Sequence, residues 1–324
     1  MAGEAIVAEG IRKRYGDTQA LDDFHLTVAR GTVHAVLGPN GAGKTTAVRS
    51  LTTLARIDVG RAWVSGFDVA RQPDEVRARI GLTGQYAAVD EMLSGRQNLV
   101  MFGRLFRLRA QVARRRADEL LAQFGLSEAA GRSVSGYSGG MRRRLDLAAS
   151  MVVVPEVLFL DEPTTGLDPR SRNQVWDAVR SLVAGGTTVL LTTQYLEEAD
   201  QLADLISVVD SGRVVADGTA DQLKSRLGGD RVEVVVRHSV ELARAAGIMR
   251  RVCGVPTEVD EDERRVVARV ADRVLALTEV ARALRDAGLA VEDLGTRRPT
   301  LDEVFLHLTG QGGHQTATQE GEAA

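Results

Sequence analysis

The chain lacks several features that would assign it to common classes of protein. Cys253 is the only cysteine, which excludes an intrachain disulfide and a cysteine zinc site and agrees with a reducing cytoplasm. No run of about 18 apolar residues occurs, and the best candidate, Leu145 to Leu160, is interrupted by Asp146, Pro155 and Glu156. The N-terminus has no basic region followed by an apolar core, so no signal peptide is expected. Any membrane role is therefore expected to come through a partner.

A strong net charge is also lacking. The formal net charge is −3 over 324 residues, which provides no basic footprint for nucleic acid. A charged fraction of 26% and a hydrophobic fraction of 44% are those of a soluble globular protein, and the length allows roughly two domains. Lysine is scarce, because only Lys13, Lys44 and Lys224 occur among 41 basic residues. A lysine at position 44, where arginine is otherwise the rule, indicates a site that requires a compact ammonium group.

The stretch from Gly38 to Thr45 fits G-x-x-x-x-G-K-S/T, the phosphate-binding loop of nucleotide triphosphatases. Residues 32–37 before it are a short apolar run of strand type, and residues 45–54 after it have apolar side chains at helical spacing. Glycines let the backbone curl around phosphate oxygens, and the following helix adds its unpaired N–H groups. Lys44 is expected to reach the β- and γ-phosphates, and the Thr45 hydroxyl to ligate Mg²⁺. The alternative, a glycine-rich turn without a ligand, is disfavoured by the strand before it and the helix after it.

Two acidic residues end a second buried strand. Residues 157–160 form a continuous apolar run, typical of a strand buried on both faces of a parallel sheet, and Asp161 and Glu162 follow it. Asp161 can hold Mg²⁺ through water, and Glu162 can orient and deprotonate an attacking water. In an arbitrary protein such a pair is more often a satisfied turn. We favour the catalytic interpretation because a phosphate loop precedes it.

Further candidates lie in a helical region expected at about residues 87–153 and on either side of it. Ser138 is predicted to be the N-cap of a helix that stops at Pro155. A buried strand at 187–192 leads to Gln194. Tyr15 is either a half-buried strand tyrosine or an aromatic surface for adenine, and the downstream nucleotide loop favours the second interpretation.

A second, smaller domain is expected after a glycine-rich linker at 227–230. Its predicted elements are a strand at 231–237, a helix at 239–251, strands at 256–260 and 265–270, a helix at 273–287 and a strand at 290–294. This β-α-β-β-α-β order suggests a small α+β, ferredoxin-like fold. We therefore expect domains over residues 1–228 and 229–310, a last helix at 301–308 and a disordered tail over 311–324.

Taken together, the motifs resemble those of ATP-binding cassette (ABC) ATPases over about residues 5–225. The resemblance implies an α/β fold with a phosphate loop and a helical signature subdomain, ATP and Mg²⁺ as ligands, and hydrolysis of ATP to ADP and phosphate. Residues 138–141 match the signature motif, which closes the ATP site of another copy of the chain. Since each chain has one loop and one signature, a head-to-tail homodimer would bury two ATP molecules.

The resemblance also implies a role for each matched residue. The residues implied to contact ATP are Tyr15, Gly38, Pro39, Asn40, Gly41, Ala42, Gly43, Lys44, Thr45, Thr46 and Gln85. Those implied to hold Mg²⁺ are Thr45, Gln85 and Asp161. Those implied in catalysis are Glu162 as the base, Lys44 and Gln194. Those implied to act between subunits are Ser138, Gly139, Gly140, Met141 and Asp168.

This sequence departs from the family pattern in two places. Tyr137 and Met141 flank the Ser-Gly-Gly where leucine and glutamine are usual, which leaves the hydroxyl and the glycines in place. Gln194 stands where the family usually has histidine. Glutamine can donate a hydrogen bond to a γ-phosphate, but it carries neither a titratable proton nor a charge.

Three segments are similar to the daunorubicin-resistance type of drug-export ATPase: residues 84–91, 192–195 and 301–306. That similarity implies efflux of a hydrophobic drug or antibiotic through a separately encoded membrane permease, with this chain peripheral on the cytoplasmic face of the cell membrane. Residues 301–306 are either an assembly segment for the permease or a packing helix, and both interpretations stay open. The alternative functions are export of a polysaccharide or lipid, and a non-transport ABC regulator that binds ATP with little turnover.

Overall fold

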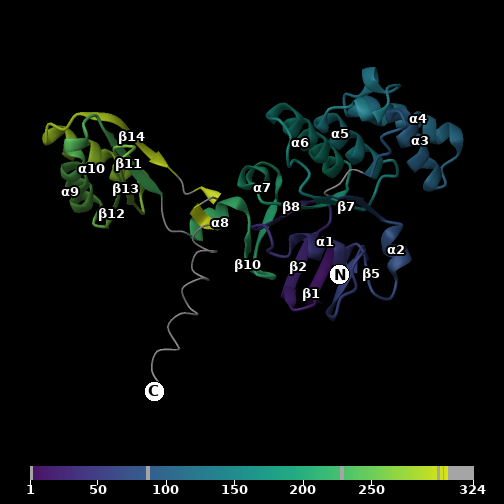
Figure 1. Ribbon diagram of the computed structural model, residues 1–324. Helices are drawn as coiled ribbons and strands as arrows, with labels where there is room; N and C mark the ends of the chain where they lie inside the picture. Colours follow the sequence, from purple (N-terminus) through teal and green to yellow (C-terminus); the bar gives the residue numbers. More distant parts are fainter. Residues whose placement is uncertain (1–2, 85–87, 227–229, 298–299, 302, 306–324) are drawn as a thin grey trace. The chain divides into compact units, whose positions relative to one another are not determined.

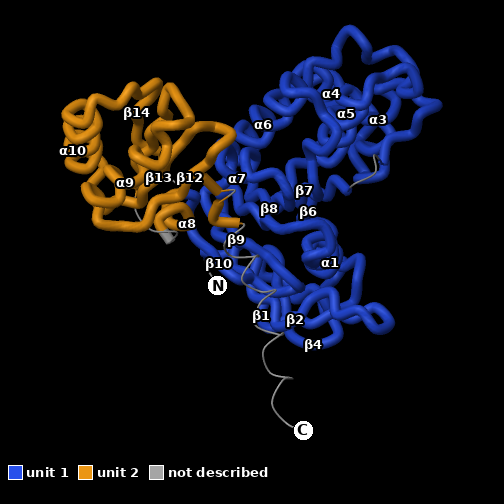
Figure 2. Tube along the Cα trace, turned by 60° about the vertical axis from the view of Figure 1, so that its left-hand side comes forward, with its two compact units in different colours: residues 1–220 blue, residues 221–324 orange. Residues whose placement is uncertain are grey.

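The structure is a computed structural model that describes residues 3–84, 88–226, 230–297, 300–301 and 303–305 (Figure 1). The chain divides into two compact units, residues 1–220 and 221–324 (Figure 2). The domain boundary expected at residue 228 stays a prediction. Each unit is described by itself below.

The first unit begins with a four-stranded antiparallel sheet. In sheet order its strands are β2 (Thr18–Ala29), β1 (Glu4–Tyr15), β4 (Val59–Val64) and β5 (Phe67–Asp68). In β2, Phe24, Leu26 and Val28 are buried and alternate with exposed residues, as expected for a sheet with one face on the core. Strand β1 continues to Tyr15, with register shifts against β2 along the way.

A six-stranded sheet forms the centre of this unit. In sheet order its strands are β10 (Arg213–Gly218), β9 (Leu205–Asp210), β3 (Val33–Leu37), β8 (Thr188–Thr193), β7 (Val157–Asp161) and β6 (Ile80–Thr83). All residues of β3, β7 and β8 are buried, which explains why most of their side chains are apolar. The strands from β9 to β6 are parallel, so the segments that follow β3, β7 and β8 all leave the sheet at the carboxyl ends of the strands.

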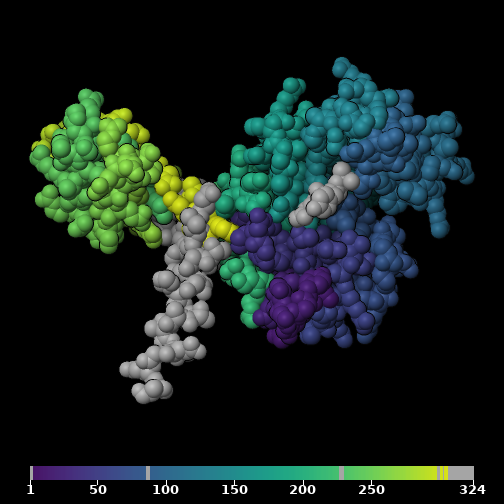
Figure 3. All heavy atoms as spheres, viewed as in Figure 1, coloured from purple at the N-terminus to yellow at the C-terminus, as the bar shows by residue number. Residues whose placement is uncertain are grey.

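The helices of this unit lie on both sides of this sheet or pack on other helices beside it (Figure 1). They are α1 (Lys44–Leu51), α2 (Pro73–Arg77), α3 (Gly95–Leu105), α4 (Ala110–Gln123), α5 (Gly139–Ser150), α6 (Pro169–Ala184) and α7 (Leu196–Leu202). In Figure 3 the helical part, blue to teal, lies above the purple antiparallel sheet within this unit. One core cluster joins α1, the antiparallel sheet and side chains of the central sheet such as Val36, Phe159 and Leu190. The α/β class expected from the sequence is confirmed.

Helix α8 (Ala220–Arg226) begins at the last residue of the first unit, and the second unit after it confirms the expected β-α-β-β-α-β order. Its elements are β11 (Arg231–Val236), α9 (Leu242–Cys253), β12 (Thr257–Asp260), β13 (Arg265–Arg269), α10 (Arg273–Asp286) and β14 (Val291–Arg297). The antiparallel sheet has the order β12-β13-β11-β14. Val232, Val234 and Val236 of β11 pack with α9 and α10 in the core.

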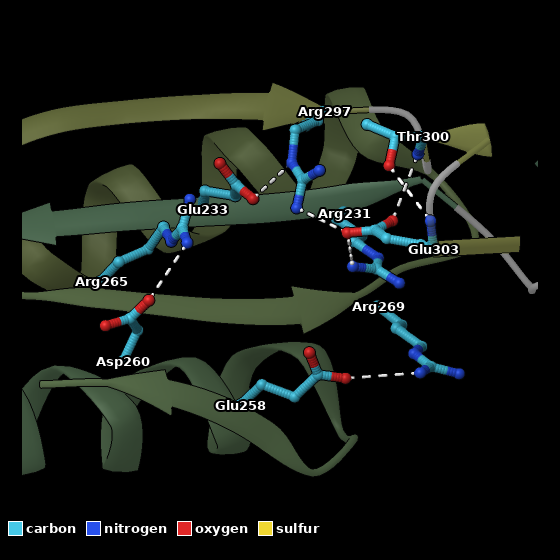
Figure 4. A network of polar contacts seen from close by, with 9 residues as sticks. All are labelled: Arg231, Glu233, Glu258, Asp260, Arg265, Arg269, Arg297, Thr300 and Glu303. Carbon is cyan, nitrogen blue, oxygen red and sulfur yellow. Dashed lines mark hydrogen bonds and ion pairs between the residues drawn. The ribbon is translucent and has the colours of Figure 1, made fainter. Parts of the chain in front are cut away.

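The opposite face of that sheet carries a network of charged side chains (Figure 4). Glu303 accepts hydrogen bonds from Arg231 at 2.6 Å and Arg297 at 2.9 Å, and Arg297 also donates to Glu233 at 2.6 Å. Thr300 and Glu303 exchange hydrogen bonds in the manner of a capping box, Thr300 N–H to Glu303 and Glu303 N–H to Thr300 Oγ1. The helical residues 301 and 303–305 are thereby tied to the strand residues of their own unit.

Candidate functional site

The phosphate loop lies at the carboxyl end of β3 and leads directly into α1. Gly43 caps α1 with φ of 103°, a left-handed conformation that favours glycine. A Cβ on Gly43 would lie 2.4 Å from the carbonyl oxygen of Ala20, and one on Gly38 would lie 2.4 Å from that of Val209. The backbone therefore requires glycine at both positions.

Lys44 is buried inside this loop, with 5% of its surface exposed. Its Nζ donates hydrogen bonds to the carbonyl oxygens of Gly38 at 2.8 Å and Pro39 at 3.0 Å, and it lies 3.5 Å from Glu162 Oε1. An open pocket beside it is lined by Thr18, Gln19, Ala20, Asn40, Gly41, Gly43, Lys44, Thr45, Thr46 and Glu162. The arrangement offers an anion one buried cation and the N–H groups at the start of a helix.

The acid pair lies beside the phosphate loop, as the sequence predicts. Asp161 is buried, and its Oδ1 accepts hydrogen bonds from Thr192 Oγ1 at 2.6 Å and Thr45 Oγ1 at 3.3 Å. Because β8 lies between β3 and β7, Thr192 can reach Asp161 from the neighbouring strand. The Thr45 hydroxyl and the Asp161 carboxylate form a pair of oxygen donors of the kind that Mg²⁺ prefers.

Glu162 has a constrained backbone. Its φ is 51°, in the left-handed region that non-glycine residues rarely adopt. The Glu162 N–H donates to the carbonyl oxygen of Thr192 at 3.1 Å and to its hydroxyl at 3.2 Å, while Thr165 Oγ1 donates to Glu162 Oε2 at 3.3 Å. Residues in this conformation cluster at functional sites, where the surrounding structure holds them in place.

The Ser-Gly-Gly stretch begins α5, which confirms Ser138 as the N-cap. Its Oγ accepts a hydrogen bond from the Met141 N–H at 3.3 Å. Ser138 and Gly139 are exposed, and among the described residues neither of them lines the pocket beside Lys44 of the same chain. Asp168 caps α6 through hydrogen bonds from the Ser171 N–H at 3.0 Å and Oγ at 2.7 Å, and these bonds hold the pKa of Asp168 below its usual range.

The structure gives fewer contacts for the remaining candidate residues, Tyr15, Gln194 and Gln85. Tyr15 is the last residue of β1 and is 47% exposed, with Lys13 Nζ 5.2 Å from its ring centroid, so both interpretations of this tyrosine stay open. It pairs in the β1–β2 hairpin with Thr18, which lines the pocket. Gln194 directly follows β8 and is partly exposed. Gln85 lies outside the described residues.

Sequence reasoning missed two side chains at the site. The sequence places Thr192 at the end of a buried strand but does not predict that its hydroxyl contacts both Asp161 and Glu162. The sequence analysis does not single out Arg143, whose guanidinium donates to the carbonyl oxygens of Asp161 and Glu162. A hydroxyl inside an apolar strand, two residues before Gln194, was the available signal for Thr192. For Arg143 the available signal was an arginine three residues before an acid in a helix with one apolar side.

A phosphate loop, a strand-end acid pair and an exposed Ser-Gly-Gly helix start on one α/β unit define an ATPase of the ABC class. A family model described as "ABC transporter" matches residues 21–165. A solved structure of the ATP-binding subunit of an ABC transporter superposes with a TM-score of 0.63 at 25% identity, over 69% of this chain and 93% of its own.

Relatives that match this chain over nearly its whole length define the family more closely. The daunorubicin resistance ATP-binding protein DrrA2 of Streptomyces coeruleorubidus is 65% identical over 99% of this chain and 99% of its own length. The daunorubicin/doxorubicin resistance ATP-binding protein DrrA of Streptomyces peucetius is 52% identical over 98% and 96%. A model of the DrrA1-3-like C-terminal domain matches residues 218–309. The chain belongs to the daunorubicin-resistance family of ABC transporter ATP-binding proteins.

Within the part of the chain that the structure describes, the helices are too short or too polar to cross a membrane.

Proposed function

We propose that this chain binds and hydrolyses ATP to drive efflux of a hydrophobic drug or antibiotic through a separate membrane permease. The observation that carries the proposal is the extent of the similarity to drug-resistance proteins. It covers 99% of the chain and includes the second unit, which the matched ABC transporter model does not reach. Expression of this chain together with the proposed membrane permease should raise drug resistance in a sensitive host, and expression of the Glu162→Gln variant with that permease should not.

Different residues of the site would bind the phosphates, the adenine and Mg²⁺ during ATP hydrolysis. Residues 38–46 bind the phosphates through backbone N–H groups and Lys44, and the exposed ring of Tyr15 offers a surface for adenine. Thr45 and Asp161, with Gln85 implied by the family pattern, would hold Mg²⁺, which offsets phosphate charge when bound. Among the described residues no group of three or more histidine, cysteine or acidic side chains is arranged to hold a metal ion.

Glu162 is the proposed base. Its carboxylate faces the same pocket as Lys44, at 3.5 Å from Nζ, and its backbone is held by Thr192. A carboxylate fixed in this way can orient a water and accept its proton. Gln194, at the end of the neighbouring strand, supplies an uncharged hydrogen-bond donor for the γ-phosphate.

A head-to-tail homodimer would complete the site. The exposed start of α5, with Ser138, Gly139, Gly140 and Met141, offers a second helix N-terminus for the open side of an ATP bound to another copy. Asp168, at the start of α6, is proposed to act between the subunits. A chain that works in this way would be peripheral on the cytoplasmic face of the cell membrane and would need no nucleic acid.

Gln194 provides one test of the catalytic assignment. Gln194→Ala should slow turnover by about tenfold or more, because a hydrogen bond to a charged group is worth about 1.5–3 kcal/mol. Gln194→His should keep or raise the rate and add an inflection between about pH 5.5 and 7.5, since histidine titrates there. Steady-state ATPase activity against pH for the three proteins is the measurement. Parent-like activity of Gln194→Ala at every pH would remove Gln194 from the γ-phosphate.

The proposed domains are a nucleotide-binding domain over 1–228 and an assembly domain over 229–310. Leu301 and Val304 are buried and therefore have a packing role, whereas Phe305 is partly exposed. We expect Phe305→Glu to abolish co-purification with the permease while ATP binding is retained. Val304→Ala is the control, since it should lower thermal stability and leave co-purification intact. Loss of ATP binding and co-purification together in Phe305→Glu would assign this segment to the core.

A further inference from the structure

Arg143 joins three parts of the first unit. It lies on α5, which begins directly after Ser138. Its guanidinium donates to the carbonyl oxygens of Asp161 at 3.1 Å, Glu162 at 3.0 Å and Pro163 at 2.9 Å, all at the end of β7. It also donates to the carbonyl oxygen of Gly84, just after β6, at 2.6 Å. One side chain therefore links the α5 helix to the segment around Glu162 and to the end of β6.

The contacts suit a guanidinium and no other side chain. Arginine presents five N–H groups in a rigid planar fork, whereas the ammonium of lysine is a compact group with three donors on a flexible stem. Only 11% of the Arg143 side chain is exposed. Burial lowers the pKa of Arg143, but an arginine keeps its charge, and the carboxylates of Asp146 and Asp161 raise that pKa in opposition.

Asp146 extends the contact on the same helix. Its Oδ2 lies 3.7 Å from Arg143 Nη1, and its Oδ1 accepts a hydrogen bond from the Ala88 N–H at 2.7 Å. Arg143 and Asp146 together hold residues 84 and 88, the described positions on either side of 85–87. Asp146 is 4% exposed, and this burial raises the pKa of its carboxyl group.

These contacts constrain the backbone of Glu162. Thr192 holds the N–H of Glu162, and Arg143 holds its carbonyl oxygen, so both ends of this residue are fixed while φ is 51°. A left-handed conformation of this kind persists only where the surrounding contacts impose it. From this backbone the Glu162 side chain reaches Lys44, with Oε1 3.5 Å from Nζ.

We propose that Arg143 is a positioning residue for Glu162, linking the helix that begins at the Ser-Gly-Gly stretch to the carboxylate that serves as base. The inference rests on the proposed role of Glu162. Movement of the α5 N-terminus, as when it meets ATP on another copy, is transmitted through Arg143 to the backbone that aims Glu162.

The test is Arg143→Lys in the full chain, with Arg116→Lys as the matched control. Arg116 also donates to two backbone carbonyls, those of Met151 and Val152, at 3.1 and 3.3 Å, beyond the far end of α5. Single-turnover hydrolysis, nucleotide Kd and melting temperature are measured for each protein. Arg143→Lys should lose about tenfold or more in hydrolysis rate with Kd within about twofold, because small misplacements of a reacting group cost up to about 10²-fold. Arg116→Lys should hydrolyse ATP like the parent.

A double variant separates positioning from simple destabilisation. If Arg143 acts through Glu162, adding Arg143→Lys to the Glu162→Gln variant should not lower the hydrolysis rate any further. Equal losses in both backgrounds, or parent-like hydrolysis by Arg143→Lys, would overturn the inference. Arg143→Gln, which keeps a neutral amide group with two N–H donors, gives the same comparison if the lysine variant does not fold. Parent-like hydrolysis by Glu162→Gln itself would overturn the base assignment and this inference together, whereas an unaffected Arg143→Lys beside an inactive Glu162→Gln overturns this inference alone.

Discussion

Glu162→Gln is expected to keep ATP binding and to lower ATP turnover by about 10²–10⁴-fold, the usual contribution of a positioned base. The amide has nearly the shape of the carboxylate but cannot accept a proton from water. Lys44 and the loop N–H groups, which bind the phosphates, are untouched. Since ATP is then consumed slowly, the ATP-bound dimer should live long enough to be seen by size-exclusion chromatography.

The matched control for this variant is Glu197→Gln. Glu197 pairs with Arg172 at 3.0 Å, and its side chain is 66% exposed, so its charge should matter little to turnover. Wild-type-like turnover in Glu162→Gln would remove Glu162 from the base role. Slow turnover without any ATP-dependent dimer would instead contradict the proposed homodimer.

Lys44→Ala is expected to weaken nucleotide binding itself. Charge-assisted hydrogen bonds are worth about 1.5–3 kcal/mol, which corresponds to roughly 10–150-fold in Kd. In the described structure the Lys44 ammonium donates to the carbonyls of Gly38 and Pro39. A phosphate must replace those partners, which places the expected loss toward the lower end of that range. Turnover should fall at least as far as affinity.

The measurement is the Kd of a fluorescent ATP analogue by titration. Lys224→Ala, a substitution of the same kind in α8 of the second unit, is the control and should bind nucleotide like the parent. An unchanged Kd for Lys44→Ala would mean that residues 38–45 are a glycine-rich turn without the proposed ligand.

Much of the fold was predictable because local patterns matched their surroundings. The apolar runs at 157–160 and 187–192 are strands buried on both faces, and Ser138 caps a helix through its own side chain. The strand and helix order of the second unit followed from alternating valines and helical spacing. These signals depend on residues close in sequence.

The site was predictable only in part, because some of its contacts join residues far apart in the chain. Thr192 contacts Asp161 through the order of parallel strands, which no local pattern specifies. Arg143 reaches Gly84, 59 residues away, only when α5 packs across two strand ends. The contact of Ser138 with ATP is proposed to lie in another copy of the chain, so the fold of a single chain does not contain it.

ATP-driven drug accumulation in inverted membrane vesicles tests the central claim most directly. The vesicles would contain this chain together with its membrane permease, and the probe would be daunorubicin, followed by its fluorescence. We expect accumulation on addition of ATP with the parent chain and none with Glu162→Gln, although both chains should bind the vesicles equally. Equal accumulation with both chains, or none with a parent that hydrolyses ATP, would contradict the account.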